Sequence, residues 1–241
     1  MSRKPFDWSL LDRASLYSMM YRLRSSIVDQ ELSVKDLQQL LSSHIKYYLP
    51  VRVRMDSDPT HEAGLVYIGG AYYADHDVEG RRQIEVVFSY QDTDAVIKVN
   101  DNRWRRMCAL FADTILHEII HMRQYRTREF KLIPGYESTA YSAKHRKEQE
   151  YYGHPDEMGA LRFNIACELY DKFGDDFSAA TAYLDSSLPK RTKKSCYYKY
   201  LKAFDNNQNH SIIRSLKKKI LRNLPNAQIG KPFRTNDHLT Y

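Results

Sequence analysis

Hydrophobic positions near the start of the chain follow a helical period. Across residues 9–30 apolar side chains recur at intervals of three and four, and residues 34–45 repeat this spacing. Ser33 precedes the second segment and is suited to cap a helix N-terminus, while Pro50 marks its end. We therefore predict two helices in this region.

The period then shortens to two. Val51, Val53 and Met55 alternate with polar residues, as on a half-buried strand, and further strands are predicted at residues 65–73, 84–90 and 95–99. Gly69 and Gly70 interrupt the second strand and indicate a bulge or bend. The pattern predicts a small, mostly antiparallel sheet.

Helical spacing returns after the strands. A long helix is predicted from Asp101 or Asn102 to about Arg126, followed by an irregular loop with one helical piece near residues 140–150. Pro155 starts another helix that Gly174 closes. Shorter helices are expected at residues 176–185, 192–204 and 210–223. The fold class is thus α+β, divided into N-terminal helices at 1–50, a central domain at 51–173 and a helical extension at 174–241.

Composition is that of an ordinary globular protein. Of the 241 residues, 42% are hydrophobic and 28% are charged, which argues against disorder. No run approaches the length of a membrane helix, and the basic N-terminus lacks the apolar segment of a secretory signal. The three cysteines are far apart and predict no disulfide framework. We expect a cytoplasmic protein without a membrane partner.

The long helix carries the sequence HEIIH at residues 117–121. Two histidines four residues apart lie on one face of a helix, where both imidazoles can bind one Zn²⁺ ion. Glu118 lies beside them and is placed to act as general base toward a water molecule. The alternative is a pair of surface histidines, but the apolar residues around the motif predict a buried helix, where unpaired polar groups are costly.

A catalytic zinc ion needs a third protein ligand. Glu157, in the first turn of the helix that Pro155 starts, is the favoured candidate, and the small residues Gly159 and Ala160 suit close helix packing. His154, Asp156 and His145 remain as alternatives. A metzincin is excluded, because Gln124 and Thr127 stand where that class has glycine and histidine.

These motifs carry a resemblance to known enzymes. The segments HEIIHMRQYR and YYGHPDEMGALRFNIACEL resemble zinc metallopeptidases of the zincin group, in particular the glutamate-liganded gluzincins. They are also similar to small metallopeptidase-like proteins of tailed bacteriophages. The likeness covers roughly residues 51–173. It implies a minimal zincin-like domain with His117, His121 and Glu157 as zinc ligands and Glu118 as base.

The resemblance also implies a peptide-binding edge strand, here residues 84–90 or 95–99. The chain departs from many gluzincins at Leu161, where they carry an aspartate that orients a histidine, so Asp113 or Asn164 is the candidate for that role. An oxyanion donor is expected on the loop before Pro155. The candidates are Tyr136, Tyr141, Tyr151, Tyr152, His145 and His154.

Positive charge is concentrated late in the chain. Residues 186–224 hold eleven Lys or Arg residues against a single acid, Asp205. Such a segment can bind a polyanion such as nucleic acid, or an acidic protein surface. The candidate contacts are Lys193, Lys194, Lys217, Lys218 and Lys219.

The sequence therefore predicts a zinc-dependent metallopeptidase-like hydrolase that acts on a peptide or protein substrate. If the gene belongs to a phage, the protein would work in the host cytoplasm or in the virion. The alternative is a structural or nucleic-acid-associated protein, for instance a virion component, that keeps a zinc site with little or no turnover.

Overall fold

The computed structural model describes residues 6–91, 96–186 and 195–224 of this α+β protein. Contacts between residues divide the chain into two compact units, Met1–Met122 and Arg123–Tyr241. Lys193 and Lys194, two of the predicted polyanion contacts, lie outside the described residues. No helix in the described part of the chain has the length and apolar character needed to cross a membrane.

The first predicted helix is broken into short pieces. A 3-10 turn at Trp8–Leu10 precedes helices α1 (Arg13–Tyr21) and α2 (Arg24–Ile27). Asp12 explains the first break, because its side chain accepts a hydrogen bond from the Ser15 backbone while the Ser15 hydroxyl accepts one from the Asp12 backbone. The prediction of one continuous helix across residues 9–30 is therefore wrong.

The second predicted helix is confirmed. Helix α3 spans Val34–Tyr48, and the Ser33 side chain accepts a hydrogen bond from the Asp36 backbone. Its apolar stripe of Leu37, Leu41 and Ile45 is buried. The short strand β1 (Glu31–Ser33) precedes it and pairs with β5 (Val96–Lys98) in an antiparallel ladder.

A three-stranded sheet forms the centre of the first unit. Its strands are β2 (Arg52–Ser57), β3 (Tyr67–Tyr72) and β4 (Ile84–Tyr90), in the order β2-β4-β3. The β2–β4 pair is parallel and the β3–β4 pair antiparallel, so the sheet is mixed. No bulge occurs at Gly69 and Gly70, which face Val87 and Val86 in regular register.

Strand β4 lies between the other two strands. The prediction that residues 84–90 form an edge for a peptide is therefore wrong, and β5 belongs to the separate pair with β1. Between β3 and β4 the chain forms the short helix α4 (Ala74–Val78).

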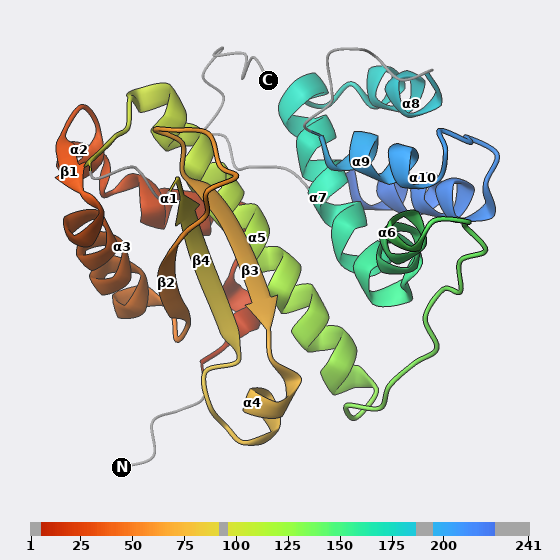
Figure 1. Ribbon diagram of the computed structural model, residues 1–241, viewed down its shortest axis with the longest axis horizontal. Helices are drawn as coiled ribbons and strands as arrows, with labels where there is room; N and C mark the ends of the chain where they lie inside the picture. The colour runs from red at the N-terminus through yellow and green to blue at the C-terminus, as the bar shows by residue number, and fades with distance from the viewer. Residues whose placement is uncertain (1–5, 92–95, 187–194, 225–241) are drawn as a thin grey trace. The chain divides into compact units, whose positions relative to one another are not determined.

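One face of the sheet packs on a long helix. Helix α5 runs from Asp101 to Thr127 and crosses behind the sheet in Figure 1. Ile84, Val86 and Phe88 are fully buried on this face, and the Phe88 ring stacks on Phe111 of α5 at 6.5 Å between centroids. Asn100 caps the helix, since its side chain accepts a hydrogen bond from the Arg103 backbone. The sequence prediction placed this cap one or two residues later.

The second unit is helical. Its helices are α6 (Ala143–Gly153), α7 (Pro155–Phe173), α8 (Phe177–Asp185), α9 (Cys196–Ala203) and α10 (Ser211–Asn223). Helix α7 packs against each of the others. Pro155 starts α7 and Gly174 ends it with a positive φ of 60°, as predicted. The core combines the buried aliphatic side of α7 with Tyr200, Phe204 and Ile213.

Candidate metal centre

His117 and His121 lie one turn apart on one face of α5, with His117 half-buried and His121 buried. Their Nε2 atoms are 3.1 Å apart, and the two ring centroids are separated by 4.8 Å. His121 is buried, as the apolar surroundings of the motif led us to expect. Both imidazoles therefore present a ring nitrogen to the same small region beside the helix.

This spacing fits two ligands of one zinc ion. With bonds of about 2.0–2.1 Å at the tetrahedral angle, two ligand nitrogens lie about 3.3–3.4 Å apart. The separation of 3.1 Å between the two Nε2 atoms is within a few tenths of an ångström of that value. Neutral imidazole nitrogen is also a donor that zinc prefers.

Glu118, which follows His117 directly in the sequence, is buried, with 5% of its surface exposed. Its side chain lies beside Gly70 of β3, together with Thr114 one turn earlier on α5. A carboxylate in such a place is removed from bulk water, which strengthens its interactions with nearby charges. Its position on the helix places it next to the histidines rather than on the solvent side.

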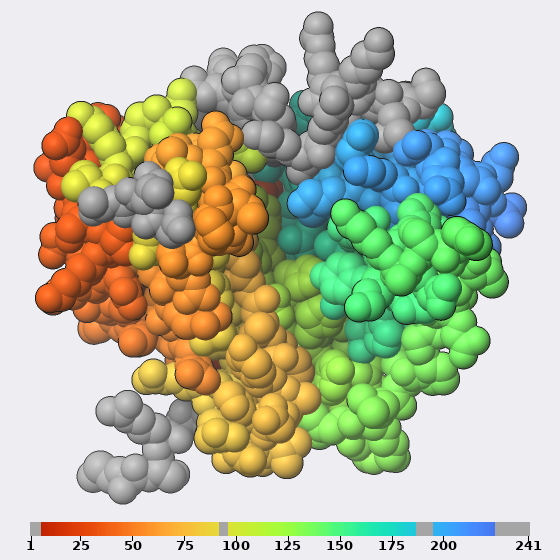
Figure 2. Space-filling model, in the orientation of Figure 1, coloured from red at the N-terminus to blue at the C-terminus, as the bar shows by residue number. Residues whose placement is uncertain are grey.

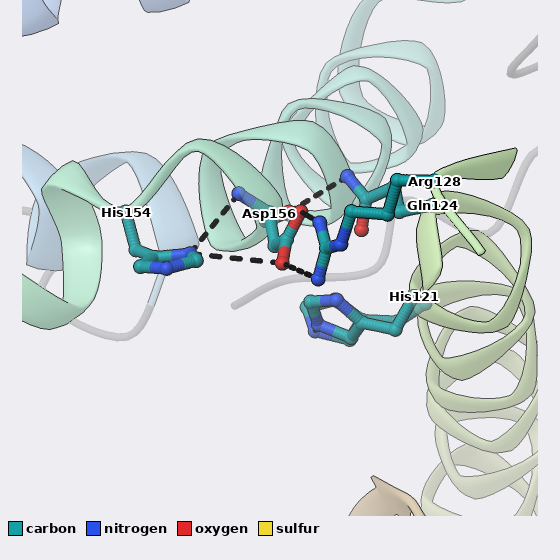
Figure 3. A network of polar contacts seen from close by, with 6 residues as sticks. His121, Gln124, Arg128, His154 and Asp156 are labelled. Atoms are coloured by element: carbon teal, nitrogen blue, oxygen red, sulfur yellow. Dashed lines mark hydrogen bonds and ion pairs between the residues drawn. The ribbon is translucent and has the colours of Figure 1, made fainter. Parts of the chain in front are cut away.

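The third ligand candidate lies in the first turn of α7. Gln124, in the last turn of α5, and Arg128, just after the helix, hold this turn (Figure 3). Arg128 forms a bidentate ion pair with the Asp156 carboxylate at 2.6 and 2.8 Å, and the Gln124 amide donates to the Asp156 carbonyl at 3.1 Å. Gly159 gives the Gln124 side chain its room, since a methyl group there would lie 2.1 Å from Nε2. Gly159 thus has the role in close packing that its size predicted.

The alternatives to Glu157 that the sequence offered have interactions of their own in the second unit. Both oxygens of Asp156 are bound by Arg128, and Nδ1 of His154 accepts a hydrogen bond from the Asp156 backbone as the cap of α7. His145 interacts with Gln149 at 2.9 Å and lies 3.4 Å from Asp205. Each alternative ligand thus already has a partner within the second unit.

His117, His121 and Glu157 form a group that could hold a metal ion. One ligand atom from each residue can be chosen so that all three lie within 4.8 Å of one another. Two imidazoles and one carboxylate make the donor set of several catalytic zinc sites, which leave a further position open. The group consists of the same three residues that the sequence predicted.

The Arg128–Asp156 pair should contribute strongly to stability. Both side chains are mostly buried, at 16% and 8% exposure, and removing one partner of such a pair costs about 3–5 kcal/mol. We expect Arg128→Met to lower the melting temperature by about 10 °C in thermal unfolding followed by circular dichroism.

The matched control is Lys131→Met. Lys131 lies three residues after Arg128 and pairs with Glu129. Both side chains are largely exposed, so the expected change is under about 1 kcal/mol. Equal shifts for the two variants would mean that the buried pair has no special role in holding α7.

The residues expected to support the site have other partners. Arg13 binds both oxygens of Asp113, at 2.6 and 3.1 Å, so this carboxylate ties α1 to α5. Among the oxyanion candidates, Tyr136 packs on Gly153 and the Phe204 ring, and Tyr152 packs on Tyr200. Burial raises the pKa of Tyr200, and the neighbouring Glu157 carboxylate raises it further. Tyr141 and Tyr151 are the exposed members of the set.

Sequence reasoning missed Gln124 and Arg128 as parts of this region. Gln124 lies on the face of α5 that carries His117 and His121, and Arg128, which directly follows the helix, continues the same spacing. Positions 117, 121, 124 and 128 are separated by the helical intervals of four and three. This periodicity could have placed Gln124 and Arg128 near the two histidines from the sequence alone. The sequence suggested only a bulge at Gly70. Its place opposite the HEIIH helix could not be predicted, because it depends on strand pairing that the sequence does not display.

The lysines of α10 that were predicted to contact a polyanion differ in their partners and in their exposure. Lys217 donates to Asp185 at 2.9 Å, and Lys219 lies 3.3 Å from the Met158 sulfur, where burial and the nearby Arg162 lower its pKa. Lys218 is exposed. The exposed cations of α9 and α10 are Lys199, Lys202, Arg214, Lys218 and Arg222.

Comparisons with known proteins identify no relative. No family model matches the chain, and neither a curated protein nor a solved structure matches it.

Proposed function

We propose that the protein is a zinc-dependent hydrolase that cleaves peptide bonds, with chemistry like that of the gluzincins. The observation that carries the proposal is the convergence of the two Nε2 atoms at 3.1 Å beside the buried Glu118. The grouping of Glu157 with the histidines supports a three-residue ligand set. Two imidazoles, a carboxylate ligand and an adjacent carboxylate base are the parts that metal-assisted hydrolysis needs.

Each residue has a distinct role in this proposal. His117, His121 and Glu157 hold the ion, which when bound supplies Lewis-acid activation of water and of the substrate carbonyl. Glu118 accepts the proton of the attacking water on its carboxylate and then transfers it to the leaving amine. The Arg128–Asp156 pair and Gln124 keep the first turn of α7 in place, which fixes the direction of Glu157.

The edge strand β3 is the proposed place for the substrate backbone. β3 lies at one edge of the sheet, and its Gly70 is the strand residue beside Glu118. An extended peptide that pairs with an edge strand gains main-chain hydrogen bonds without any requirement on its side chains. This replaces the two strands that the family resemblance suggested.

Hydrolysis of an unstructured protein such as casein by the zinc-loaded chain tests the proposal. We expect new N-termini to appear with the wild type and not with Glu118→Gln. If the zinc-loaded wild type releases no peptides from any unstructured substrate, the hydrolase proposal fails.

A second candidate function is binding of a polyanion, with the metal site in a structural role. It is favoured by the exposed stripe Arg214, Lys218 and Arg222, which are spaced four residues apart on α10. Helices α9 and α10 lie at the surface of the second unit (blue in Figure 2). No acidic residue occurs in α10 to neutralise the stripe.

Replacing Arg214, Lys218 and Arg222 by Ser should weaken binding to DNA or heparin. Each lost phosphate contact should reduce the slope of log affinity against log salt by about 0.9. A salt titration by fluorescence anisotropy measures both quantities. The control replaces Lys144, Arg146 and Lys147 of α6, which are also exposed and carry the same charge. Equal loss in both variants would show that only net charge matters.

A further inference from the structure

Gly70 lies on the face of β3 that is turned toward α5. In the sheet register it stands opposite Val86, and Ile68 and Tyr72 share its side of the strand. Across from it on α5 are Thr114 and Glu118, which are four residues apart and therefore on one face of the helix. The general base of the proposed reaction thus packs on a strand position that has no side chain.

The space at Gly70 is already filled by the helix. A Cβ atom added there would lie 2.6 Å from Cγ2 of Thr114 and 2.9 Å from both Cγ and Oε1 of Glu118. These distances are well inside van der Waals contact, which for carbon atoms is about 3.5–4.0 Å. Thr114 is β-branched and has few χ1 rotamers on a helix, whereas the longer Glu118 side chain has more rotatable bonds and is the group that moves more readily.

The requirement for glycine here is spatial rather than conformational. The described glycines with positive φ are Gly64, Gly80 and Gly174, so the backbone at Gly70 suits any L-residue. Gly69 offers the comparison. It is the adjacent residue, it points to the other face of the sheet, and an added Cβ would meet nothing within 4 Å.

We infer that Gly70 is a positioning residue for Glu118: the missing side chain at this one strand position creates the space that the carboxylate occupies beside the ligand pair. A single methyl group at this position would displace the base while leaving the metal ligands unchanged. The inference on catalysis rests on the proposed function, whereas the packing relation between Gly70 and Glu118 does not.

The kinetic test compares Gly70→Ala with Gly69→Ala in the zinc-loaded chain. A misplacement of about 1 Å can cost about 100-fold in rate, so kcat of Gly70→Ala should fall by that factor. Zinc content should stay at the wild-type level, and KM should change little because the β3 backbone is intact. Gly69→Ala, whose added Cβ meets nothing within 4 Å, should lower kcat far less than Gly70→Ala. Equal kcat in the two variants, or a loss confined to KM, would overturn the positioning role.

A double-mutant cycle tests the packing without any substrate. In the wild-type background Gly70→Ala should lower the melting temperature by about 2–10 °C, as expected for an overpacked contact. In a Thr114→Ala, Glu118→Ala background the same substitution should cost nothing, because the atoms that it meets are gone. Gly69→Ala should show no such coupling. Additive effects at Gly70 would refute the inference.

The two tests separate the two proposals. Coupling in the cycle together with a wild type that cleaves no substrate would leave the packing of Glu118 on Gly70 established and would sink the hydrolase proposal alone. Activity in the wild type without coupling at Gly70 would support the hydrolase proposal and refute the positioning role of Gly70.

Discussion

Glu118→Gln is expected to reduce peptide hydrolysis by about 10²–10⁴-fold, the range that a general base contributes. Glutamine has the shape of glutamate and can occupy the same buried space beside Gly70. Its amide cannot accept the proton of the attacking water at neutral pH. The rate of release of new N-termini from casein, at equal zinc loading, measures the effect.

The variant also separates catalysis from metal binding. Glu118 is not among the proposed ligands, so zinc content and melting temperature should remain close to the wild-type values. Glu137→Gln is the control, because Glu137 is exposed on the loop before α6 and the substitution changes charge in the same way. If Glu118→Gln cleaves at the wild-type rate, another group accepts the proton.

Removing both histidine ligands is expected to eliminate zinc binding. The wild-type chain should contain about one zinc ion, and the His117→Ala, His121→Ala variant close to none. The reason is geometric, because the two Nε2 atoms lie 3.1 Å apart, close to the spacing of two ligands of one zinc ion. Elemental analysis after dialysis against a weak chelator gives the stoichiometry.

Two single variants extend this test to the third ligand. Glu157→Ala should weaken zinc binding measurably in chelator competition, while His145→Ala should leave it unchanged because His145 interacts with Gln149 and Asp205. Equal zinc content in the wild type and the double histidine variant would refute the site. A loss with His145→Ala would transfer the third ligand to α6.

The elements that the sequence predicted well are those with strong local signals. Strand β4 has the predicted limits, because it is a continuous apolar and β-branched run between turn residues. Helix α7 begins at Pro155 and ends before Gly174 for reasons that act within one turn of the chain. The closeness of His117 and His121 was also predictable, since residues four apart on a helix share a face.

Errors arose where pairing between distant residues decides the structure. The sheet order β2-β4-β3, which puts β4 in the centre, depends on how three strands meet and leaves little trace in any one of them. The break between the 3-10 turn at Trp8–Leu10 and helix α1 came from a local cause instead. A local cap at Asp12 overrides an apolar pattern that continues through it.

Interactions around the candidate site were the hardest to predict. The partners of Asp113 and Asp156 are Arg13 and Arg128, which lie 100 and 28 residues away in the sequence. With 37 Lys and Arg residues in the chain, composition alone cannot choose between them. The role of Gly70 was equally hard to predict, because it depends on Thr114 and Glu118, which lie opposite it on α5.

Helix α5 has a consequence for how the chain can be divided. It is one helix of 27 residues, about 40 Å long, yet the boundary between the two compact units falls within it, after Met122. A cut at this boundary would separate His121 from Gln124 and Arg128, and both fragments would end in a helix without its cap. An insertion between Met122 and Gln124 would turn the part of the helix beyond it by about 100° per added residue.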